Sequence, residues 1–264
     1  MEPFHFRAGT APLLVSMPHV GTYLPAELAA RMTDAALFLP DTDWHLERLY
    51  DFLDALGASV LIATHSRYVV DLNRPPDNAN LYPGQDTTGL VPIDTFARAS
   101  VYRDGALPTE AEVAARVERH WQPYHAQLQR ELDRLHAAHG YALLWDAHSI
   151  ASEVPRFFPG RLPDLNLGTA GGVSCAPAIE TAVAAVARAA PAYSAVLNGR
   201  FKGGYITRRY GRPDAGVHAI QLELAEITYM DEARPYGFDE VRAARLRPHL
   251  RAMLEEMLEA ARLI

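Results

Sequence analysis

Short apolar segments alternate with longer segments of helical periodicity along most of this chain, and this alternation limits the possible folds more than any other feature. The apolar segments of strand length cover residues 13–17, 59–63, 68–72, 141–145, 194–197 and 218–224. The helical patterns cover residues 43–56, 110–139 with a break near Pro123, 178–189 and 238–263. Strands that alternate with helices predict an α/β fold, in which helices cover both faces of a largely parallel or mixed sheet.

Two segments, residues 75–108 and 149–172, are rich in Pro and Gly and interrupt this alternation. The first is long for a connection without regular structure, so we expect it to form a lid or rim of a functional site. The 264-residue chain shows neither an internal repeat nor a convincing linker. We therefore predict a single catalytic domain, residues 1–264.

The charge pattern argues against binding to nucleic acid. The net charge is −7, and the 25 Lys and Arg residues form no long basic stripe that could neutralise phosphates. No apolar run approaches the roughly 20 residues that span a bilayer, so no membrane partner is expected. Cys175 is the single cysteine, which excludes an internal disulfide framework, and the N-terminus lacks a signal-peptide pattern. A cytoplasmic enzyme is the expectation.

Reactive side chains stand where the predicted strands end, which is where such sheets gather functional groups. His19 follows the first apolar run, His148 follows the run at 141–145, and Asn73 and Arg74 follow the run at 68–72. Glu223 lies inside an apolar strand between two leucines. A buried carboxylate there needs a compensating partner, and a metal-bound water is one such partner.

Two histidines and one carboxylate, with a fourth position left open, form a recurring catalytic zinc set. A single histidine after a strand is more often a hydrogen-bonded loop residue, so this prediction depends on finding two. We choose Asp43 as the carboxylate ligand, because it stands close behind the first strand. Spacing alone leaves Asp41 and His45 as rivals. The chain contains no HExxH, no CxxC pair and no GxSxG, so the common zincin and serine-hydrolase motifs are absent.

Eight segments together resemble the N-formylglutamate amidohydrolase (deformylase) family. They are SMPHVGTYLP, DTDWHLERLY, SRYVVDLNRPPD, LYPGQDTTGL, DAHS, GRLPDLNLGT, NGRFKGGYITRRYG and HAIQLELAEITYMDE. The resemblance extends from about residue 10 to residue 255. It implies a zinc-type hydrolase of histidine degradation that releases formate and glutamate from a small acidic N-acyl amino acid.

A looser similarity is to the zinc metallocarboxypeptidases. Their motifs follow the order of a histidine and an acidic ligand, Asp-Leu-Asn-Arg, His-Ser, and a glutamate before leucine. The same order recurs here as His19 and Asp43, residues 71–74, His148-Ser149 and Glu223-Leu224. The similarity implies a three-layer α/β/α sandwich around a mixed, mostly parallel sheet. One departure is Thr22, which stands where the carboxypeptidase pattern has a glutamate ligand.

A mechanistic hypothesis gives each candidate residue a role. His19, Asp43 and His148 would hold Zn²⁺ or a similar divalent ion, and Glu223 would serve as general base and then as general acid. Arg67 would stabilise the oxyanion, and Asp146 could orient a ligand histidine. The candidates for contacts with the two substrate carboxylates are Asn73, Arg74, Tyr205, Arg208 and Arg209.

Three other functions fit parts of the pattern. A zinc-dependent amidase or carboxypeptidase for a different N-acyl acidic amino acid would share the same metal site. A metal-binding scaffold without activity is disfavoured, because it has no use for a buried Glu223. A serine hydrolase that uses Ser149 lacks the expected motif around that serine. The sequence is compatible with a homo-oligomer and does not distinguish among divalent metals.

Overall fold

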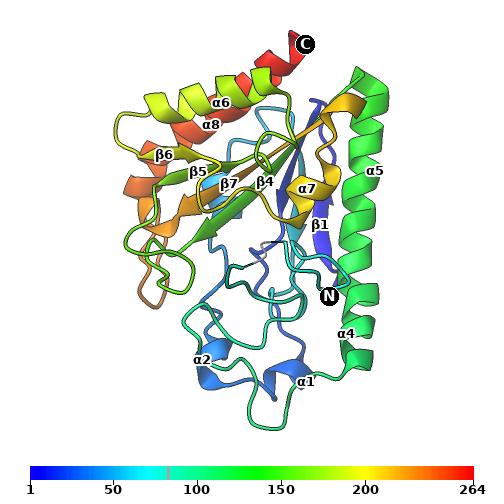
Figure 1. Ribbon diagram of the computed structural model, residues 1–264, viewed down its shortest axis with the longest axis vertical. Helices are drawn as coiled ribbons and strands as arrows, with labels where there is room; N and C mark the ends of the chain where they lie inside the picture. The colour runs from blue at the N-terminus through cyan, green and yellow to red at the C-terminus, as the bar shows by residue number, and fades with distance from the viewer. Residues whose placement is uncertain (82–83) are drawn as a thin grey trace.

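A mixed sheet of seven strands organises the part of the chain that this computed structural model describes, residues 1–81 and 84–264 (Figure 1). The strands are β1 Phe4–Arg7, β2 Leu13–Met17, β3 Ser59–Ala63, β4 Ala142–Ile150, β5 Leu165–Gly168, β6 Ala195–Leu197 and β7 Val217–Ala225. Their order across the sheet is β1-β3-β2-β4-β7-β5-β6. The central strands β3, β2, β4 and β7 are parallel, whereas β1 and β5 each pair antiparallel with a neighbour.

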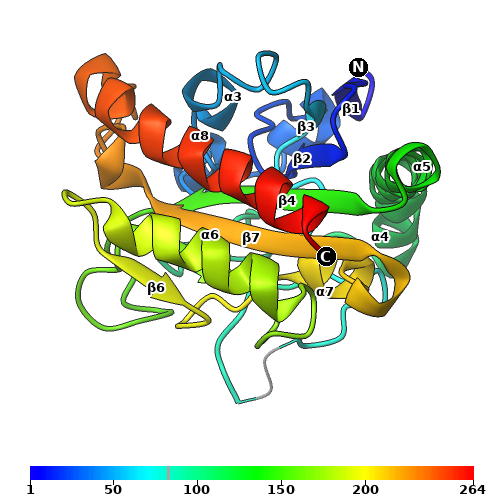
Figure 2. The same cartoon turned by 90° about the horizontal axis from the view of Figure 1, so that it is seen from above.

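Helices cover both faces of this sheet, which confirms the predicted α/β/α sandwich. Along β4 the side chains alternate: Leu143 and Trp145 face one cluster, and Leu144 faces the other. The first cluster contains α6 Pro177–Ala189 and α8 Glu240–Arg262, which lie next to each other (Figure 2). The second contains α5 Gln122–His139 and α7 Tyr205–Tyr210.

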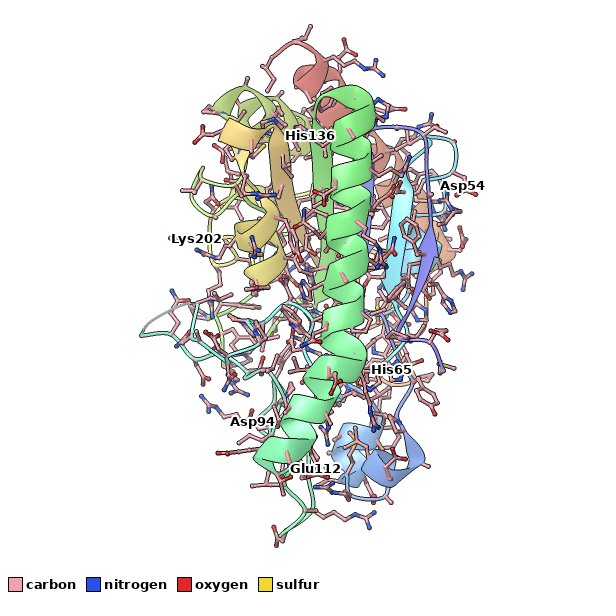
Figure 3. The ribbon with its side chains drawn as sticks, turned by 90° about the vertical axis from the view of Figure 1, so that its right-hand side faces the viewer. Asp54, His65, Asp94, Glu112, His136 and Lys202 are labelled. Carbon is pink, nitrogen blue, oxygen red and sulfur yellow. The ribbon has the colours of Figure 1, made fainter. Side chains whose placement is uncertain are left out.

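The helix before β4 runs as one long element (Figure 3). It comprises α4 Glu110–Arg116, a π-helical turn at Val117–Trp121, and α5. The break that Pro123 predicts is therefore a change of helical pitch and not an interruption, because proline fits within the first turn of α5. The remaining short helices are α1 Ala26–Ala29, α2 Asp34–Leu37, α3 Leu46–Leu49, and the 3₁₀ turns Pro213–Ala215 and Glu226–Thr228. No helix in the described ranges is long and apolar enough to cross a membrane.

Most predicted elements are confirmed, and two are wrong. Residues 43–56 form only the four-residue α3 followed by turns. The left-handed backbone of His45 (φ 63°) prevents an earlier start, and Tyr50 (φ −89°, ψ 37°) leaves the helical conformation directly after α3. Residues 68–72 are not a strand. Their apolar side chains are buried in two different clusters. This burial accounts for the run of apolar residues although the segment pairs with no strand.

Other features also differ from the prediction. The strand predicted at 141–145 extends to Ile150 and carries His148 within it. The segment 149–172 contains β5, and α7 lies in the Gly-rich segment that precedes β7. As expected, the described residues of 75–108 contain no helix or strand longer than a single bridge.

Candidate active site

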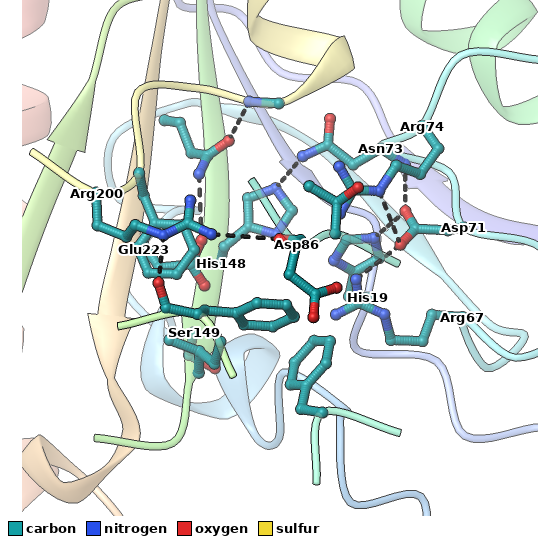
Figure 4. A pocket seen from close by; sticks show the side chains of 17 residues that line it. His19, Arg67, Asp71, Asn73, Arg74, Asp86, His148, Ser149, Arg200 and Glu223 are labelled. Carbon is teal, nitrogen blue, oxygen red and sulfur yellow. Dashed lines mark hydrogen bonds and ion pairs between the residues drawn. The ribbon is translucent and has the colours of Figure 1, made fainter. Parts of the chain in front are cut away.

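One pocket at the carboxyl ends of β2, β4 and β7 gathers most of the predicted residues (Figure 4). His148 and Glu223 are paired in register on neighbouring strands, and His19 follows β2 by two residues. The segment between β3 and α4 supplies Arg67 and Asn73 on one side. The loops that follow β4 and β6 supply the opposite side, through Phe157, Arg200 and Phe201.

His19, Asp43 and His148 form a buried candidate metal-binding triad. One potential ligand atom from each lies within 4.8 Å of the others. The Oδ2 atom of Asp43 is 3.0 Å from Nδ1 of His148 and 3.7 Å from Nδ1 of His19. A hydrogen bond of 3.1 Å from the Asp43 amide to the His19 carbonyl holds the two loops together.

The two rival ligands have other partners. Asp41 accepts hydrogen bonds from the Tyr68 hydroxyl (2.8 Å) and from the Phe96 amide (2.9 Å). The Nε2 atom of His45 lies 2.8 Å from the Tyr236 carbonyl oxygen. Neither belongs to the triad that the described residues form.

The second nitrogen of each histidine faces a carboxylate. Nε2 of His19 lies 2.7 Å from Oδ1 of Asp71, and Nε2 of His148 lies 3.2 Å from Oδ2 of Asp146. Carboxylates in this position fix the orientation of metal-binding imidazoles and increase their basicity. With two Nδ1 atoms and a carboxylate directed at one point, these residues fit a divalent metal that prefers nitrogen and oxygen ligands.

The electrostatics of the triad favour a positive charge. Burial alone would raise the pKa of Asp43, but His19 and His148 outweigh it and lower that pKa. Burial opposes a charged imidazole, yet Asp146 and Asp43 raise the pKa of His148 well above its usual value. Asp43 therefore stays ionised, and a cation beside it would be strongly attracted.

Glu223 combines burial with a fixed orientation. Burial, opposed in part by the nearby His148, raises the pKa of Glu223 to about 8. The Gln221 side chain donates a hydrogen bond of 3.2 Å to Oε2 of Glu223 and accepts one of 2.7 Å from the Gly204 amide. A carboxyl group with a pKa near neutrality can both accept and deliver a proton.

Two arginines lie on the His19 side of the pocket. Arg67 is buried, donates a hydrogen bond of 2.7 Å to Asp71, and lies 4.8 Å from the centre of the Phe96 ring. Arg74 is more exposed, with its Nε atom 4.0 Å from Asp71. Asn73 also lines the pocket, with the nitrogen of its side-chain amide 2.9 Å from Nε2 of His148.

Three predicted substrate contacts lie elsewhere. The Tyr205 ring packs 5.7 Å from that of Trp121, Arg208 donates to the Gly203 carbonyl (2.9 Å), and Arg209 is exposed. The described residues that line the pocket include none of the three.

Sequence reasoning missed several pocket residues, namely Arg200, Gln221, Phe96, Phe157 and Phe201. Gln221 could have been found, because residues two apart on a strand share a face and Gln221 precedes Glu223 by two. Arg200 lies within the segment NGRFKGGYITRRYG, but nothing in the sequence distinguishes it there from Arg208 and Arg209.

Comparison with known proteins agrees with this geometry. Residues 11–230 match the family model described as N-formylglutamate amidohydrolase. The chain is 52% identical over 257 residues to an N-formylglutamate deformylase of Pseudomonas aeruginosa, covering 97% of this chain and 96% of that protein. It is 49% identical over 253 residues to the corresponding deformylase of Pseudomonas putida, covering 96% of this chain and 94% of that protein.

A solved structure extends the likeness to three dimensions. The crystal structure of an N-formylglutamate amidohydrolase from Ralstonia eutropha JMP134 superposes with a TM-score of 0.85 at 25% identity, and the match covers 100% of both chains. The family match covers most of the chain, and identity to the curated relatives reaches half. The chain therefore belongs to the N-formylglutamate amidohydrolase family.

Proposed function

We propose that this protein hydrolyses N-formyl-L-glutamate to L-glutamate and formate, through one catalytic domain formed by residues 1–264. The observation that carries the proposal is the grouping of His19, Asp43 and His148 with Glu223 and arginine side chains in one pocket. Such a pocket offers the metal ligands, the proton-transfer group and the cations that hydrolysis of an acidic N-acyl amino acid requires. The deformylases that are 52% and 49% identical to this chain support the choice of substrate.

His19, Asp43 and His148 would hold one divalent ion, and zinc suits two imidazoles and a carboxylate. When bound, such an ion lowers the pKa of a water molecule towards about 7 and polarises a carbonyl group. Asp71 and Asp146 keep the two imidazoles oriented through their second nitrogens.

Glu223 transfers the proton. Its carboxylate accepts a proton from the attacking water as the water oxygen bonds to the formyl carbon. It then delivers that proton to the amine nitrogen as the carbon–nitrogen bond breaks, which gives formate and glutamate. The buried Arg67 guanidinium supports this reaction by stabilising the negative charge that develops on the formyl oxygen.

Arg74, with Asn73 beside it, would bind the α-carboxylate of the substrate. A guanidinium offers two parallel donors to a carboxylate, and Arg74 lines the pocket with a partly exposed side chain. Contacts from Tyr205, Arg208 and Arg209 stay predictions, and they would require a change in the α7 region that brings these side chains towards the pocket.

A formate-release assay tests the proposal. Extended chelation should abolish hydrolysis of N-formylglutamate, and Zn²⁺ or a similar ion should restore it. The variants His19→Ala and His148→Ala should lower both metal content and activity, whereas His249→Ala on α8 should lower neither. Parallel assays with N-formylaspartate and N-acetylglutamate measure the acyl and side-chain preference. Full activity in rigorously metal-free protein would overturn the mechanism.

A further inference from the structure

We propose that Arg200 binds the side-chain carboxylate of the substrate and so determines the preference for an acidic N-acyl amino acid. This inference rests on the proposed function and adds a specificity residue to it. Arg200 is an alternative to Arg208 and Arg209, the candidates that the sequence suggested for this role, and unlike them it lines the pocket in the described structure.

Arg200 stands across the pocket from Arg74. Figure 4 shows Arg200 on the side of Glu223, whereas Arg67, Arg74 and Asp71 lie together on the side of His19. A dicarboxylate substrate carries two negatively charged groups that are separated along its carbon chain, so each needs its own cationic partner. Two arginines on opposite sides of one pocket match this separation, with the site of hydrolysis between them.

The surroundings of Arg200 fix the direction of its guanidinium. Its Nε atom donates a hydrogen bond of 2.6 Å to the Phe157 carbonyl oxygen. The guanidinium carbon also lies 5.7 Å from the centre of the Phe157 ring and 5.4 Å from that of Phe201. A planar cation held by aromatic rings and backbone carbonyl groups loses little side-chain entropy when it binds a carboxylate.

The same aromatic rings explain why the charge of the substrate would matter. Phe96, Phe157 and Phe201 line the pocket, so a substrate bound against these apolar rings would be partly shielded from water. Ion pairing is stronger where water is excluded, and a polar group left without its partner there is costly. A neutral side chain of the same shape would therefore be rejected more strongly than in an open, polar cleft.

The side chain of Asp86 is held by two other arginines. Asp86 lines the same pocket, but its side chain is bound by Arg98 and by Arg156, the latter at 3.0 Å. Arg200 reaches the main-chain carbonyl of Asp86 at 3.5 Å. Asp86 thus fixes a segment that lines the pocket, and Arg200 forms part of the pocket wall.

The test compares two substrates that differ only in the charge of the side chain. N-formylglutamate and N-formylglutamine have nearly the same shape, and both keep the α-carboxylate. Arg200→Met keeps much of the length and removes the charge. We expect kcat/KM for N-formylglutamate to fall by about 30-fold or more, whereas kcat/KM for N-formylglutamine should change by less than about threefold. Arg200→Lys should fall between the wild type and Arg200→Met for N-formylglutamate.

Two further measurements separate a lost contact from a damaged fold. Bound zinc and thermal stability of Arg200→Met should match the wild type. Calorimetry should show weaker binding of the product L-glutamate with little change for L-glutamine. Arg188→Met, an exposed arginine at the end of α6, is the matched control and should leave both substrates unaffected.

The outcomes distinguish this inference from the proposed function. If the wild type releases no formate from N-formylglutamate, the proposed function fails. If the wild type is active but Arg200→Met lowers both substrates equally, or lowers neither, the role of Arg200 is rejected. A selective loss in Arg208→Met or Arg209→Met in place of Arg200→Met would reject it as well.

Discussion

Asp71 and His19 are joined by a buried contact of 2.7 Å between Oδ1 and Nε2. The other carboxylate oxygen of Asp71 accepts a hydrogen bond of 2.7 Å from Arg67. Burial would raise the pKa of Asp71, but His19 and Arg67 outweigh it and hold that pKa well below its usual value. Asp71 therefore stays charged, turns Nδ1 of His19 towards Asp43, and places Arg67 beside the reaction site.

Asp71→Asn should weaken metal binding without removing a ligand. The amide keeps the shape of the carboxylate but loses the charge that makes the His19 imidazole more basic. We expect metal affinity to fall by about 10-fold to 100-fold, measured by competition with a chelating dye. Asp77→Asn, on an exposed carboxylate in the following loop, is the control. Equal metal affinity in wild type and Asp71→Asn would show that Asp71 does not tune the ligand.

Glu223→Gln should separate proton transfer from metal binding. The amide has nearly the shape of the carboxyl group but cannot accept a proton from water. We expect kcat to fall by about two to four powers of ten, with metal content near that of the wild type. The carbonyl oxygen of the new amide can accept the same hydrogen bond from the Gln221 side chain, so the fold should be retained. Turnover that survives this substitution would mean that another residue acts as the base.

The histidines and Glu223 could be located from the sequence because their position follows from simple geometry. Parallel strands end at one edge of a sheet, so residues near or just beyond the carboxyl ends of separate strands meet there. His19, His148 and Glu223 do meet in this way. The layered fold was predictable for the same reason, since alternating strands and helices leave few other arrangements.

The rest of the site depends on loop conformations that apolar periodicity does not encode. Asp43 faces inward because its amide bonds to the His19 carbonyl, a contact between residues 24 positions apart. The segment from residue 198 to residue 212 contains several arginines of similar local composition. Only the path of the chain decides that Arg200 lines the pocket while Arg209 is exposed. The strand predicted at residues 68–72 was wrong for a related reason. A segment whose side chains are buried in two clusters has the same apolar sequence as a buried strand.

His125 should make the stability of the fold depend on pH. It is buried, with Nδ1 2.9 Å from the Tyr210 hydroxyl and Nε2 2.8 Å from the Leu72 carbonyl oxygen. Burial lowers the pKa of His125 to about 3 in the folded protein, against about 6.5 in the unfolded chain. Between these two pH values the unfolded chain binds more protons than the folded protein. The contribution of neutral His125 to the free energy of unfolding is therefore complete above pH 6.5 and is lost as the pH falls towards 3.

Urea unfolding at several pH values measures this effect. Because His125 contributes up to one proton, its share of the slope is at most about 1.4 kcal/mol per pH unit below its unfolded pKa. His125→Gln should show a flatter dependence between pH 6.5 and pH 4 than the wild type, although it is less stable at pH 7. His139→Gln, an exposed position at the end of α5, should keep the wild-type slope. Equal slopes in wild type and His125→Gln would contradict the prediction.

Arg74 should contribute to substrate selection and not to metal binding. A guanidinium can make two parallel charge-assisted hydrogen bonds to a carboxylate, whereas lysine offers a point charge. Arg74→Lys should therefore weaken the use of N-formylglutamate although the net charge is unchanged. Arg74→Ala should cost more, on the order of 2–5 kcal/mol in kcat/KM for a well-desolvated pair. Metal content should be the same in both variants.

Two analogues of the substrate, in each of which one carboxylate is replaced by an amide, serve as the control for this prediction. N-formylisoglutamine lacks the α-carboxylate, whereas N-formylglutamine keeps it. If Arg74 binds the α-carboxylate, Arg74→Ala should lower kcat/KM for N-formylglutamate and N-formylglutamine alike and spare N-formylisoglutamine. Arg74 also lies 4.0 Å from Asp71 and 3.3 Å from the Thr88 hydroxyl, so a structural role is the competing explanation. In that case thermal stability would fall and all three substrates would lose activity in proportion, because a displaced Asp71 affects His19 whatever the substrate carries.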